Sequence, residues 1–365
     1  MITRQLPDQP KRILLIRFGN LCEVLRGVPL LVALRMRFPH AEIAWLVEEQ
    51  AGSLLQGHQA LDRILTARKN WNRSWSEIKV LRGRLKKFQP EITLDLNENF
   101  SSSFAAWISG AKFRIGLTGG KNYGKSRLLN NIRVSTNENH AIERYLQLLQ
   151  PFGVYGCSID FDLHENEVDR IRAKEILSRV GIGLNRHYGI LDVGATSGIS
   201  AEISSESSRW PAERFAELAI YLLDQWNLPS LVVYSDREEQ AIAESVAEKG
   251  GNAVFLAPSL GVNGLASLLR LATICVGADG AALGISNAVQ TPCVGLFGAA
   301  RASQVGPYGR LCRSIQTDTA HPSLERIGTP VVCDECDAIL SAILEPAKKS
   351  ILEFKQPVLV LRPAA

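Results

Sequence analysis

Short, continuous apolar runs in the N-terminal half of the chain alternate with segments whose apolar residues recur every three or four positions. The run Ile13–Ile16 leads into helical spacing from Val24 to Leu34, and a second run follows at 42–47. Continuous apolar runs are typical of strands buried in parallel sheets, and the intervening period predicts a helix. The further elements predicted in this half are helices at 54–64, 78–88, 102–109 and from 140, and a strand at 91–96.

The C-terminal half repeats this alternation. The predicted strands are 188–193, 231–234, 253–256, 274–276 and 293–297, and the predicted helices are 212–224, 238–248 and 265–271. Alternating strands and helices are typical of α/β folds with parallel sheets. We therefore predict two Rossmann-like, doubly wound domains that face a central cleft, joined in the polar region 160–175. The predicted boundaries are 1–165 and 166–345, with a C-terminal tail at 346–365.

Composition places the chain among folded proteins. It has 365 residues, of which 46% are hydrophobic and 21% are charged. No apolar run approaches the roughly 20 residues of a membrane-spanning helix, and the N-terminus lacks the apolar core of a secretory signal. The seven cysteines are scattered, and the pair Cys333 and Cys336 has no partner pair at zinc-site spacing, so we predict a packing role for both and no metal site. We expect a cytoplasmic protein.

The net charge of +4 is unevenly distributed, because basic residues gather at 63–87 and 112–133. No aromatic RNA-binding signature or helix-turn-helix pattern accompanies them, so we do not predict a nucleic-acid partner. An anionic small molecule or an anionic lipid headgroup explains the basic residues equally well. Two basic loops, one of which also carries two tryptophans, are candidate acceptor sites, although an ordinary solvated surface remains the alternative for the first loop. Their candidate residues are Arg68, Lys69, Arg73, Lys125 and Arg127.

The stretch 274–309 combines two apolar strands with a turn and helix made of small residues. Asp279 lies at the turn, and Gly280, Ala281 and Ala282 open the helix. The N-terminus of a helix offers free N–H groups and the positive end of its dipole, which favours a phosphate. We predict that a nucleotide diphosphate docks here, although an ordinary strand–helix connection with nothing bound has the same pattern.

Glu23 follows the first strand, where a helix begins at the carboxyl edge of the sheet. That edge is the usual ligand side of such sheets, and a carboxylate there can act as a general base. The alternative is a glutamate in the first turn that only complements the helix dipole. The position alone does not separate the two hypotheses.

From Lys11 to Glu345 the sequence resembles glycosyltransferase family 9, whose best-known members are the lipopolysaccharide heptosyltransferases. The loop 68–75 is most similar to the branch that adds the first heptose, heptosyltransferase I. The resemblance depends on several motifs in the right order: KRILLIRFGNLCEVLRGVPLLVALRMRFPHAEIAWLVEE, DLNENFSSSFAAWISGAKFRIGL, RWPAERFAELA, and DGAALGISNAVQTPCVGLFG followed by GPYG.

The resemblance implies a GT-B fold and an inverting, metal-independent transfer from a nucleotide sugar such as ADP-heptose, with no further cofactor. The acceptor would be a lipid-linked anionic saccharide of the lipopolysaccharide core, reached by peripheral association with the inner face of the cytoplasmic membrane. Acceptor binding is expected in the N-terminal domain and donor binding in the C-terminal domain. The expected donor contacts are Gly194, Ala195, Thr196, Arg209, Glu239, Asp279, Gly280 and Ala281.

The chain departs from the family at three places in the expected site. Family members carry Gly-Asp, with the Asp as base, where this chain has Cys22 and Glu23. The longer side chain moves the carboxylate by on the order of 1 Å, a displacement that can cost about 100-fold in rate. The family's phosphate-binding lysine is replaced by Ser208, next to which Arg209 can substitute.

The third departure lies in the family motif Asp-Thr-Gly-x-x-His. Asp279 is retained, whereas Gly280 and Gly284 stand where the Thr and the His belong. Two alternatives therefore stay open beside an active transferase. The chain could be a catalytically degenerate homologue that binds a nucleotide sugar or glycolipid without transfer, or another GT-B enzyme such as a nucleotide-sugar epimerase.

Overall fold

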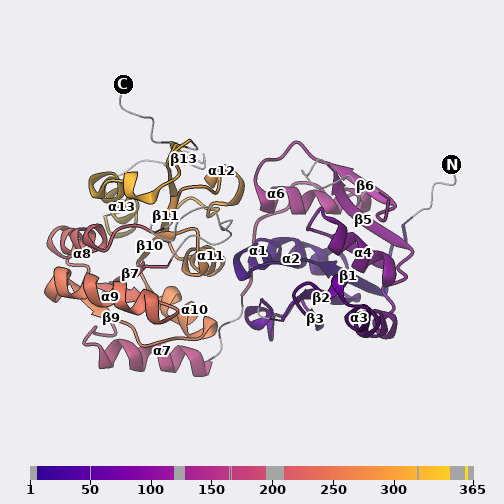
Figure 1. Cartoon of the computed structure of the whole chain (residues 1–365), viewed down its shortest axis with the longest axis horizontal. Helices are drawn as coiled ribbons and strands as arrows, with labels where there is room; N and C mark the ends of the chain where they lie inside the picture. Colours follow the sequence, from indigo (N-terminus) through magenta and orange to yellow (C-terminus); the bar gives the residue numbers. More distant parts are fainter. Residues whose placement is uncertain are drawn as a thin grey trace. The chain divides into compact units, whose positions relative to one another are not determined.

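The structure, a computed structural model, describes residues 6–49, 51–118, 128–163, 165, 167–194, 209–318, 320–345 and 358–360. The chain divides into two compact units, Met1–His164 and Glu165–Ala365 (Figure 1). Each unit is built around one parallel sheet, so the predicted α/β fold class is confirmed. None of the helices in the described residues is both long and apolar enough to span a bilayer.

Unit 1 contains a six-stranded sheet with the order β3-β2-β1-β4-β5-β6. Its strands are Arg12–Ile16 (β1), Glu42–Glu48 (β2), Arg63–Ala67 (β3), Ile92–Asp95 (β4), Phe113–Thr118 (β5) and Ile132–Ser135 (β6). Its described helices are Leu21–Leu25 (α1), Val28–Arg37 (α2), Trp75–Phe88 (α3), Phe100–Ile108 (α4) and Ala141–Leu146 (α6), with short 3-10 turns at Ser53–Leu55 (η1), Trp71–Arg73 (η2) and Gln147–Phe152 (η3). Helices α3 and α4 pack on each other, and α2 packs on α6.

Unit 2 contains a seven-stranded sheet with the order β13-β12-β11-β10-β7-β8-β9. Its strands are Gly189–Asp192 (β7), Ser230–Val233 (β8), Val254–Leu256 (β9), Ile274–Ala278 (β10), Cys293–Phe297 (β11), Cys312–Gln316 (β12) and Val358–Val360 (β13). Its helices are Glu167–Arg179 (α7), Ala212–Trp226 (α8), Arg237–Gly250 (α9), Val262–Leu271 (α10), Ala281–Ala288 (α11), Ala302–Val305 (α12) and Thr329–Leu344 (α13), with 3-10 turns at Gly251–Ala253 (η4) and Leu324–Arg326 (η5).

The two sheets share one topology. Read from the third strand of each unit, the order is 3-2-1-4-5-6, and unit 2 adds a seventh strand. The order reverses between β1 and β4 in unit 1 and between β7 and β10 in unit 2. Ligands bind open α/β sheets beyond the carboxyl ends of the strands at such switch points. Each unit therefore has one place where a site is expected.

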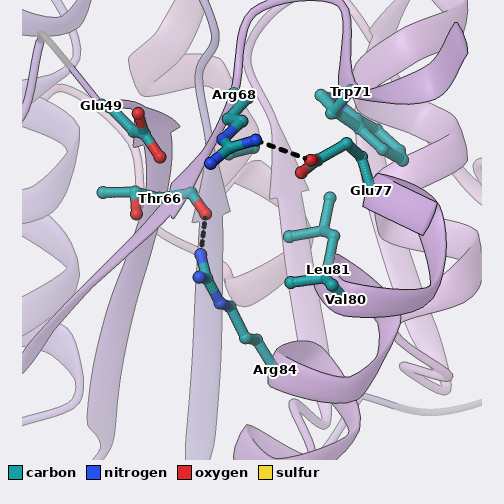
Figure 2. A pocket seen from close by; sticks show the side chains of 9 residues that line it. Glu49, Thr66, Arg68, Trp71, Glu77, Val80, Leu81 and Arg84 are labelled. Carbon is teal, nitrogen blue, oxygen red and sulfur yellow. Dashed lines mark hydrogen bonds and ion pairs between the residues drawn. The ribbon is translucent and has the colours of Figure 1, made fainter. Parts of the chain in front are cut away.

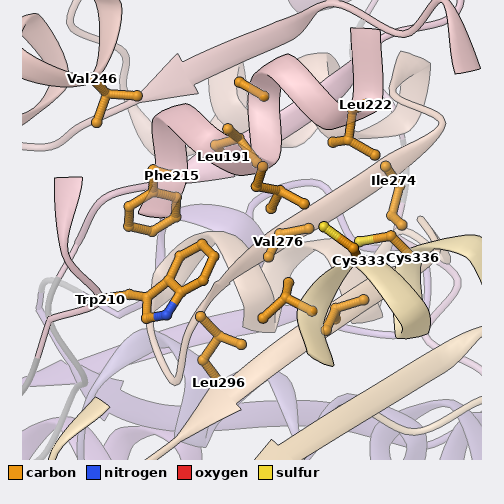
Figure 3. Close-up of a cluster of buried hydrophobic side chains, with 14 of the residues drawn as sticks. Leu191, Trp210, Phe215, Leu222, Val246, Ile274, Val276, Leu296, Cys333 and Cys336 are labelled. Atoms are coloured by element: carbon orange, nitrogen blue, oxygen red, sulfur yellow. The ribbon is translucent and has the colours of Figure 1, made fainter. Parts of the chain in front are cut away.

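The core of unit 2 buries Trp210 and Phe215 edge to face, with ring centroids 4.8 Å apart (Figure 3). The Trp210 indole N–H donates to the Ile327 carbonyl at 2.8 Å, which satisfies its polar atom inside the core. Cys333 and Cys336 of α13 lie in the same cluster. Their predicted packing role is confirmed.

One predicted helix is wrong, and one helix of the structure was not predicted. The segment 54–64 is not a helix, because Gly57 adopts a φ of +79° and Arg63–Ala67 pairs along β2 as strand β3. Pairing with the free edge of β2 outweighs the helical spacing of its few apolar residues. The expected polar linker at 160–175 contains α7, whose Ala173 and Leu177 are buried and which packs on α10. Helix α7 was not predicted, because two buried residues in a charged segment give too weak a helical periodicity.

Candidate functional site

The switch point of unit 1 is held together by a reciprocal amide contact. The Phe18 N–H, just after β1, donates to Asn97 Oδ1 at 2.6 Å, and Asn97 Nδ2 donates to the Phe18 carbonyl at 2.8 Å. Beneath Asn97, the Asp95 carboxyl at the end of β4 accepts from the Asn97 N–H at 3.1 Å and from Asn130 Nδ2 at 2.9 Å. Burial raises the pKa of Asp95 despite these donors. This network holds the start of the loop that leads from β1 into α1, the helix that carries Glu23.

Glu23 is bound on both of its carboxylate oxygens. Oε2 accepts from the Asn20 N–H at 2.9 Å while Asn20 Oδ1 accepts from the Glu23 N–H at 3.0 Å, which makes a capping box at the start of α1. Oε1 lies 3.2 Å from Arg17 Nη2; the Arg17 side chain is 10% exposed and the Glu23 side chain is 35% exposed. The carboxylate is therefore held in one place while it stays accessible.

Gly19 is required for this arrangement. It has a φ of +127°, and a Cβ there would lie 1.8 Å from Glu23 Oε2. The Arg17 guanidinium also lies 5.7 Å from the centre of the Tyr145 ring, so α6 supports the same corner. The helix-dipole hypothesis and the general-base hypothesis for Glu23 both fit this geometry.

Glu48 at the end of β2 is a neighbouring acid that the sequence did not reveal. Burial raises its pKa, the charge of Lys69 lowers it, and the charge of Glu23 raises it further. Glu48 therefore lies within electrostatic range of one predicted acceptor residue and of the predicted base. The structure brings these two predicted residues to the same end of the sheet.

The basic loop after β3 borders a pocket of about 160 Å³ between β3 and α3 (Figure 2). Arg68 Nη1 lies 3.0 Å from Glu77 Oε1, and Arg84 Nη1 donates to the Thr66 carbonyl at 2.9 Å. Trp71 is buried in the wall and stacks on Phe104, with centroids 5.7 Å apart. Arg68, Lys69 and Arg73 are exposed around this loop. The other two predicted acceptor residues, Lys125 and Arg127, lie outside the described residues.

In unit 2 the predicted phosphate cradle faces a carboxylate of its own chain. Asp192, at the end of β7, is buried and accepts a hydrogen bond from the Ala282 N–H in the first turn of α11. Its Oδ1 also accepts from the Gly194 N–H at 3.1 Å. The pKa of Asp192 is raised to about 6: burial is the main cause, the charge of the nearby Glu239 acts in the same direction, and the two backbone donors act against it. The Asp192 carboxylate therefore already accepts from one of the backbone N–H groups that we predicted to bind a phosphate.

Glu239, in the first turn of α9, lies near Asp192. Its Oε2 accepts from the Ser235 N–H at 2.7 Å and from Ser235 Oγ at 2.6 Å. A Cβ on Gly194 would lie 3.3 Å from Glu239 Oε1, so these two predicted donor contacts are neighbours. The predicted contacts Ala195 and Thr196, together with Ser208, lie outside the described residues.

Arg209 is engaged by an acid. Its guanidinium pairs with Glu238 in the first turn of α9, and its Nε is buried without a hydrogen-bond partner in the described residues. The Glu238 side chain is largely exposed, so solvent weakens this ion pair. A phosphate that reached Arg209 would compete with Glu238.

Asp279, Gly280 and Ala281 lie where β10 gives way to α11. Asp279 is buried, and Gly280 is the N-cap with extended backbone and no side chain to contribute. Gly277 is confined by Asp192, whose Cβ would lie 2.8 Å from a Cβ at that position. The sequence found Asp279, Gly280 and Ala281 but missed Asp192. A buried acid that ends an apolar strand of a parallel sheet is the signal that would have identified it.

The model of "Glycosyltransferase family 9 (heptosyltransferase)" matches residues 78–328. Lipopolysaccharide heptosyltransferase 1 of Escherichia coli K12 is 22% identical over 320 residues, which is 83% of this chain and 93% of that protein. Among solved structures, a family 9 glycosyl transferase from Veillonella parvula has a TM-score of 0.78 at 20% identity, covering 93% of this chain and 99% of that one.

The E. coli heptosyltransferase in complex with ADP-2-deoxy-2-fluoro heptose has a TM-score of 0.71 at 19% identity, covering 90% of this chain and 99% of that chain. At this identity the likeness shows the fold alone. With the two parallel sheets it confirms the predicted GT-B fold class.

Proposed function

Since the chain belongs to glycosyltransferase family 9, we propose that it transfers a sugar from a nucleotide-diphosphate donor to a lipid-linked anionic saccharide in lipopolysaccharide core synthesis. ADP-heptose is the expected donor, because a heptosyltransferase 1 is similar over 83% of this chain. The observation that carries the proposal is the family match across both units, joined to an acidic group at the switch point of each. The division into an acceptor-binding unit 1 and a donor-binding unit 2 is part of the proposal.

Glu23 is the proposed base. Its carboxylate takes the proton from an acceptor hydroxyl, the freed oxygen forms a bond to the anomeric carbon of the donor, and the bond from that carbon to the diphosphate oxygen breaks. The attack comes from the face opposite the leaving group, which inverts the anomeric centre. The accessible carboxylate, fixed by Arg17 and the Asn20 N–H, supports this role.

The donor is proposed to lie on unit 2. Gly194, Glu239, Asp279, Gly280 and Ala281 gather at the ends of β7, β8 and β10, where a nucleotide is expected in this topology. Arg209 is the proposed cation for the diphosphate, and its buried Nε, which has no hydrogen-bond partner in the part of the chain that the structure describes, supports that role. Ala195 and Thr196 complete the proposed donor set, and no metal is part of the mechanism. Arg68, Lys69, Arg73, Lys125 and Arg127 are the proposed acceptor contacts.

Binding without transfer is the second candidate function. Two observations favour it: the Asp192 carboxylate accepts from the first turn of α11, and Gly280 supplies no side chain there. A negative charge at that point opposes the diphosphate that the family's motif receives. Under this candidate the donor binds weakly or a glycolipid binds alone.

A thermal-shift screen over ADP-, UDP- and GDP-sugars separates the candidates. A ligand at about 100 times its dissociation constant stabilises the fold by about 2.7 kcal/mol. We expect a shift with an ADP-sugar, followed by ADP release that requires the saccharide acceptor and persists in EDTA. A donor shift without acceptor-dependent release would favour the second candidate, and no shift with any donor would contradict the first. An isomerised nucleotide sugar would instead identify an epimerase.

A further inference from the structure

The outward face of α4 is a stripe of aromatic rings. Phe100, Phe104 and Trp107 follow the spacing of one helix face, and their rings stack in sequence with centroids 5.6 Å and 6.0 Å apart. Phe100 is 44% and Trp107 is 53% exposed. The helix contains no charged residue. Large exposed aromatic rings that support one another mark an interaction surface, because isolated domains rarely present such a stripe to water.

The neighbouring helix α3 carries the matching cations. Trp75, Lys79, Arg82 and Lys86 are spaced by four, three and four residues, so they form one stripe along the helix. All four are exposed, and Trp75 is 80% exposed. None of the three cations pairs with an acid within the described part of the chain. With five basic residues and one glutamate, α3 carries a net charge of +4, as large as that of the whole chain.

The two stripes belong to one surface. Helices α3 and α4 pack on each other and bury their other faces in a common core, where Leu81 and Leu85 of α3 lie with Ala105 and Ala106 of α4. Phe104 joins that core to the aromatic stripe, since it stacks on the buried Trp71 as well as on its two neighbours. The stripes are therefore held on a rigid base.

We propose that this α3/α4 surface docks the protein onto an anionic lipid bilayer, with the rings at the level of the headgroups and the cations against their phosphates. Aromatic rings prefer the membrane interface, and juxtaposed lysines and arginines add attraction to anionic lipids. An acidic protein surface could pair with the cations of α3 but would not bury the continuous aromatic stripe of α4. The combination of an uncharged aromatic helix with a strongly cationic one therefore favours a bilayer as the partner. The purpose of docking rests on the proposed function, because a lipid-linked acceptor lies in a membrane; the docking itself does not.

Co-sedimentation of the full chain with vesicles tests the proposal. We expect binding to vesicles of 70% phosphatidylcholine and 30% phosphatidylglycerol at 50 mM salt, and binding at least tenfold weaker to phosphatidylcholine alone or at 500 mM salt. Each basic residue near such a surface contributes about fivefold to partitioning. The double variant Lys79→Glu/Lys86→Glu should therefore lose at least 25-fold, and Phe100→Ser/Trp107→Ser should lose about tenfold on both kinds of vesicle.

Helix α7 offers matched controls, because it is exposed but nearly balanced in charge. Arg172→Glu/Lys174→Glu and Ile171→Ser change exposed positions there and should leave partitioning unchanged. Unaltered circular dichroism and an unaltered donor-induced thermal shift would show that the α3 and α4 variants are folded. Equal partitioning of wild type and Lys79→Glu/Lys86→Glu, or equal binding to neutral and anionic vesicles, would overturn the proposal. If the wild type binds vesicles but shows no donor-induced thermal shift, that result would contradict the proposed function alone.

Discussion

The switch points of the two units have the same topology and opposite designs. In unit 1 the residue after the central strand is Arg17, which holds an accessible carboxylate, Glu23, at the sheet edge. In unit 2 the central strand ends in a carboxylate, Asp192, which is buried against the N-terminus of α11. Each unit also buries an acid with a raised pKa: Asp95 at the end of the fourth strand of unit 1 and Asp192 at the end of the first strand of unit 2.

The difference shows what the topology leaves to individual side chains. A doubly wound sheet provides backbone N–H groups and space at its switch point, but the residue that ends the central strand decides whether that space attracts anions. With Arg17 there, unit 1 holds the carboxylate that we propose as the catalytic base. With Asp192 there, the donor site proposed for unit 2 would place a diphosphate beside a buried carboxyl group, whose negative charge is removed only by protonation.

The largest expected effect comes from removing the accessible carboxylate. In Glu23→Gln the amide oxygen can still accept from the Asn20 N–H, so the capping box and the fold should survive. The loss of the base should lower kcat by on the order of 100-fold or more, with donor binding unchanged. Acceptor-dependent release of nucleoside diphosphate measures this. Full turnover by the variant would show that Glu23 only caps α1.

The second effect is a dependence of stability on pH in unit 2. The pKa of Asp192 rises from 3.8 to about 6 on folding, so its proton is bound more tightly in the folded chain. The resulting stabilisation is complete below pH 4 and is lost as the pH rises through 6. The variant Asp192→Asn has no carboxyl group to titrate at this position, so it does not lose stability in this way. Its free energy of unfolding relative to that of wild type should therefore increase by up to about 3 kcal/mol between pH 4 and pH 7.

Urea unfolding at several pH values measures this difference. Asp224→Asn, at an exposed position of α8, is the matched control and should show no such trend. A constant difference between Asp192→Asn and wild type would contradict a buried, proton-binding Asp192. The same variant also tests the comparison of the two units, since it removes the charge that opposes the diphosphate and should tighten donor binding above pH 6.

A smaller effect concerns the cation proposed for the diphosphate. Arg209→Ala should weaken donor binding by about tenfold, because a charge-assisted hydrogen bond to phosphate is lost. Glu238→Gln frees Arg209 from its ion pair and should bind the donor at least as tightly as wild type. Titration calorimetry with an ADP-sugar measures both. Wild-type affinity in Arg209→Ala would leave unit 2 without the cation that the proposal requires.

The smallest effect is expected at the acceptor loop. Arg68 is 69% exposed and already pairs with Glu77, so Arg68→Ala should raise the KM for a deacylated, water-soluble acceptor only a few-fold and leave the donor KM unchanged. Arg82→Ala, in the α3 stripe, should not change either value with this acceptor. A raised KM in Arg82→Ala would assign the α3/α4 surface to the saccharide instead of the bilayer.

The sequence by itself determined the class of fold and the family, and located most of the candidate groups. Apolar runs such as Ile13–Ile16 and Cys293–Phe297 are local signals that survive in the folded chain, because strands of a parallel sheet are buried on both faces. Glu23, Arg209 and Asp279 were found because each stands next to a turn after a strand or before a helix. The edge strand β3 and helix α7 were missed because pairing and packing with distant segments, not local period, select them.

Only the tertiary structure decided how these groups are used. Three contacts join residues that are far apart in the sequence. Asp192 accepts from the Ala282 N–H, and Arg209 pairs with Glu238. Glu48 lies near Glu23 and Lys69. Burial raises the pKa of Asp95, Asp192 and Glu48, and this burial arises only when the sheets are assembled. The stripes on α3 and α4 likewise become one surface only where the two helices pack on a common core.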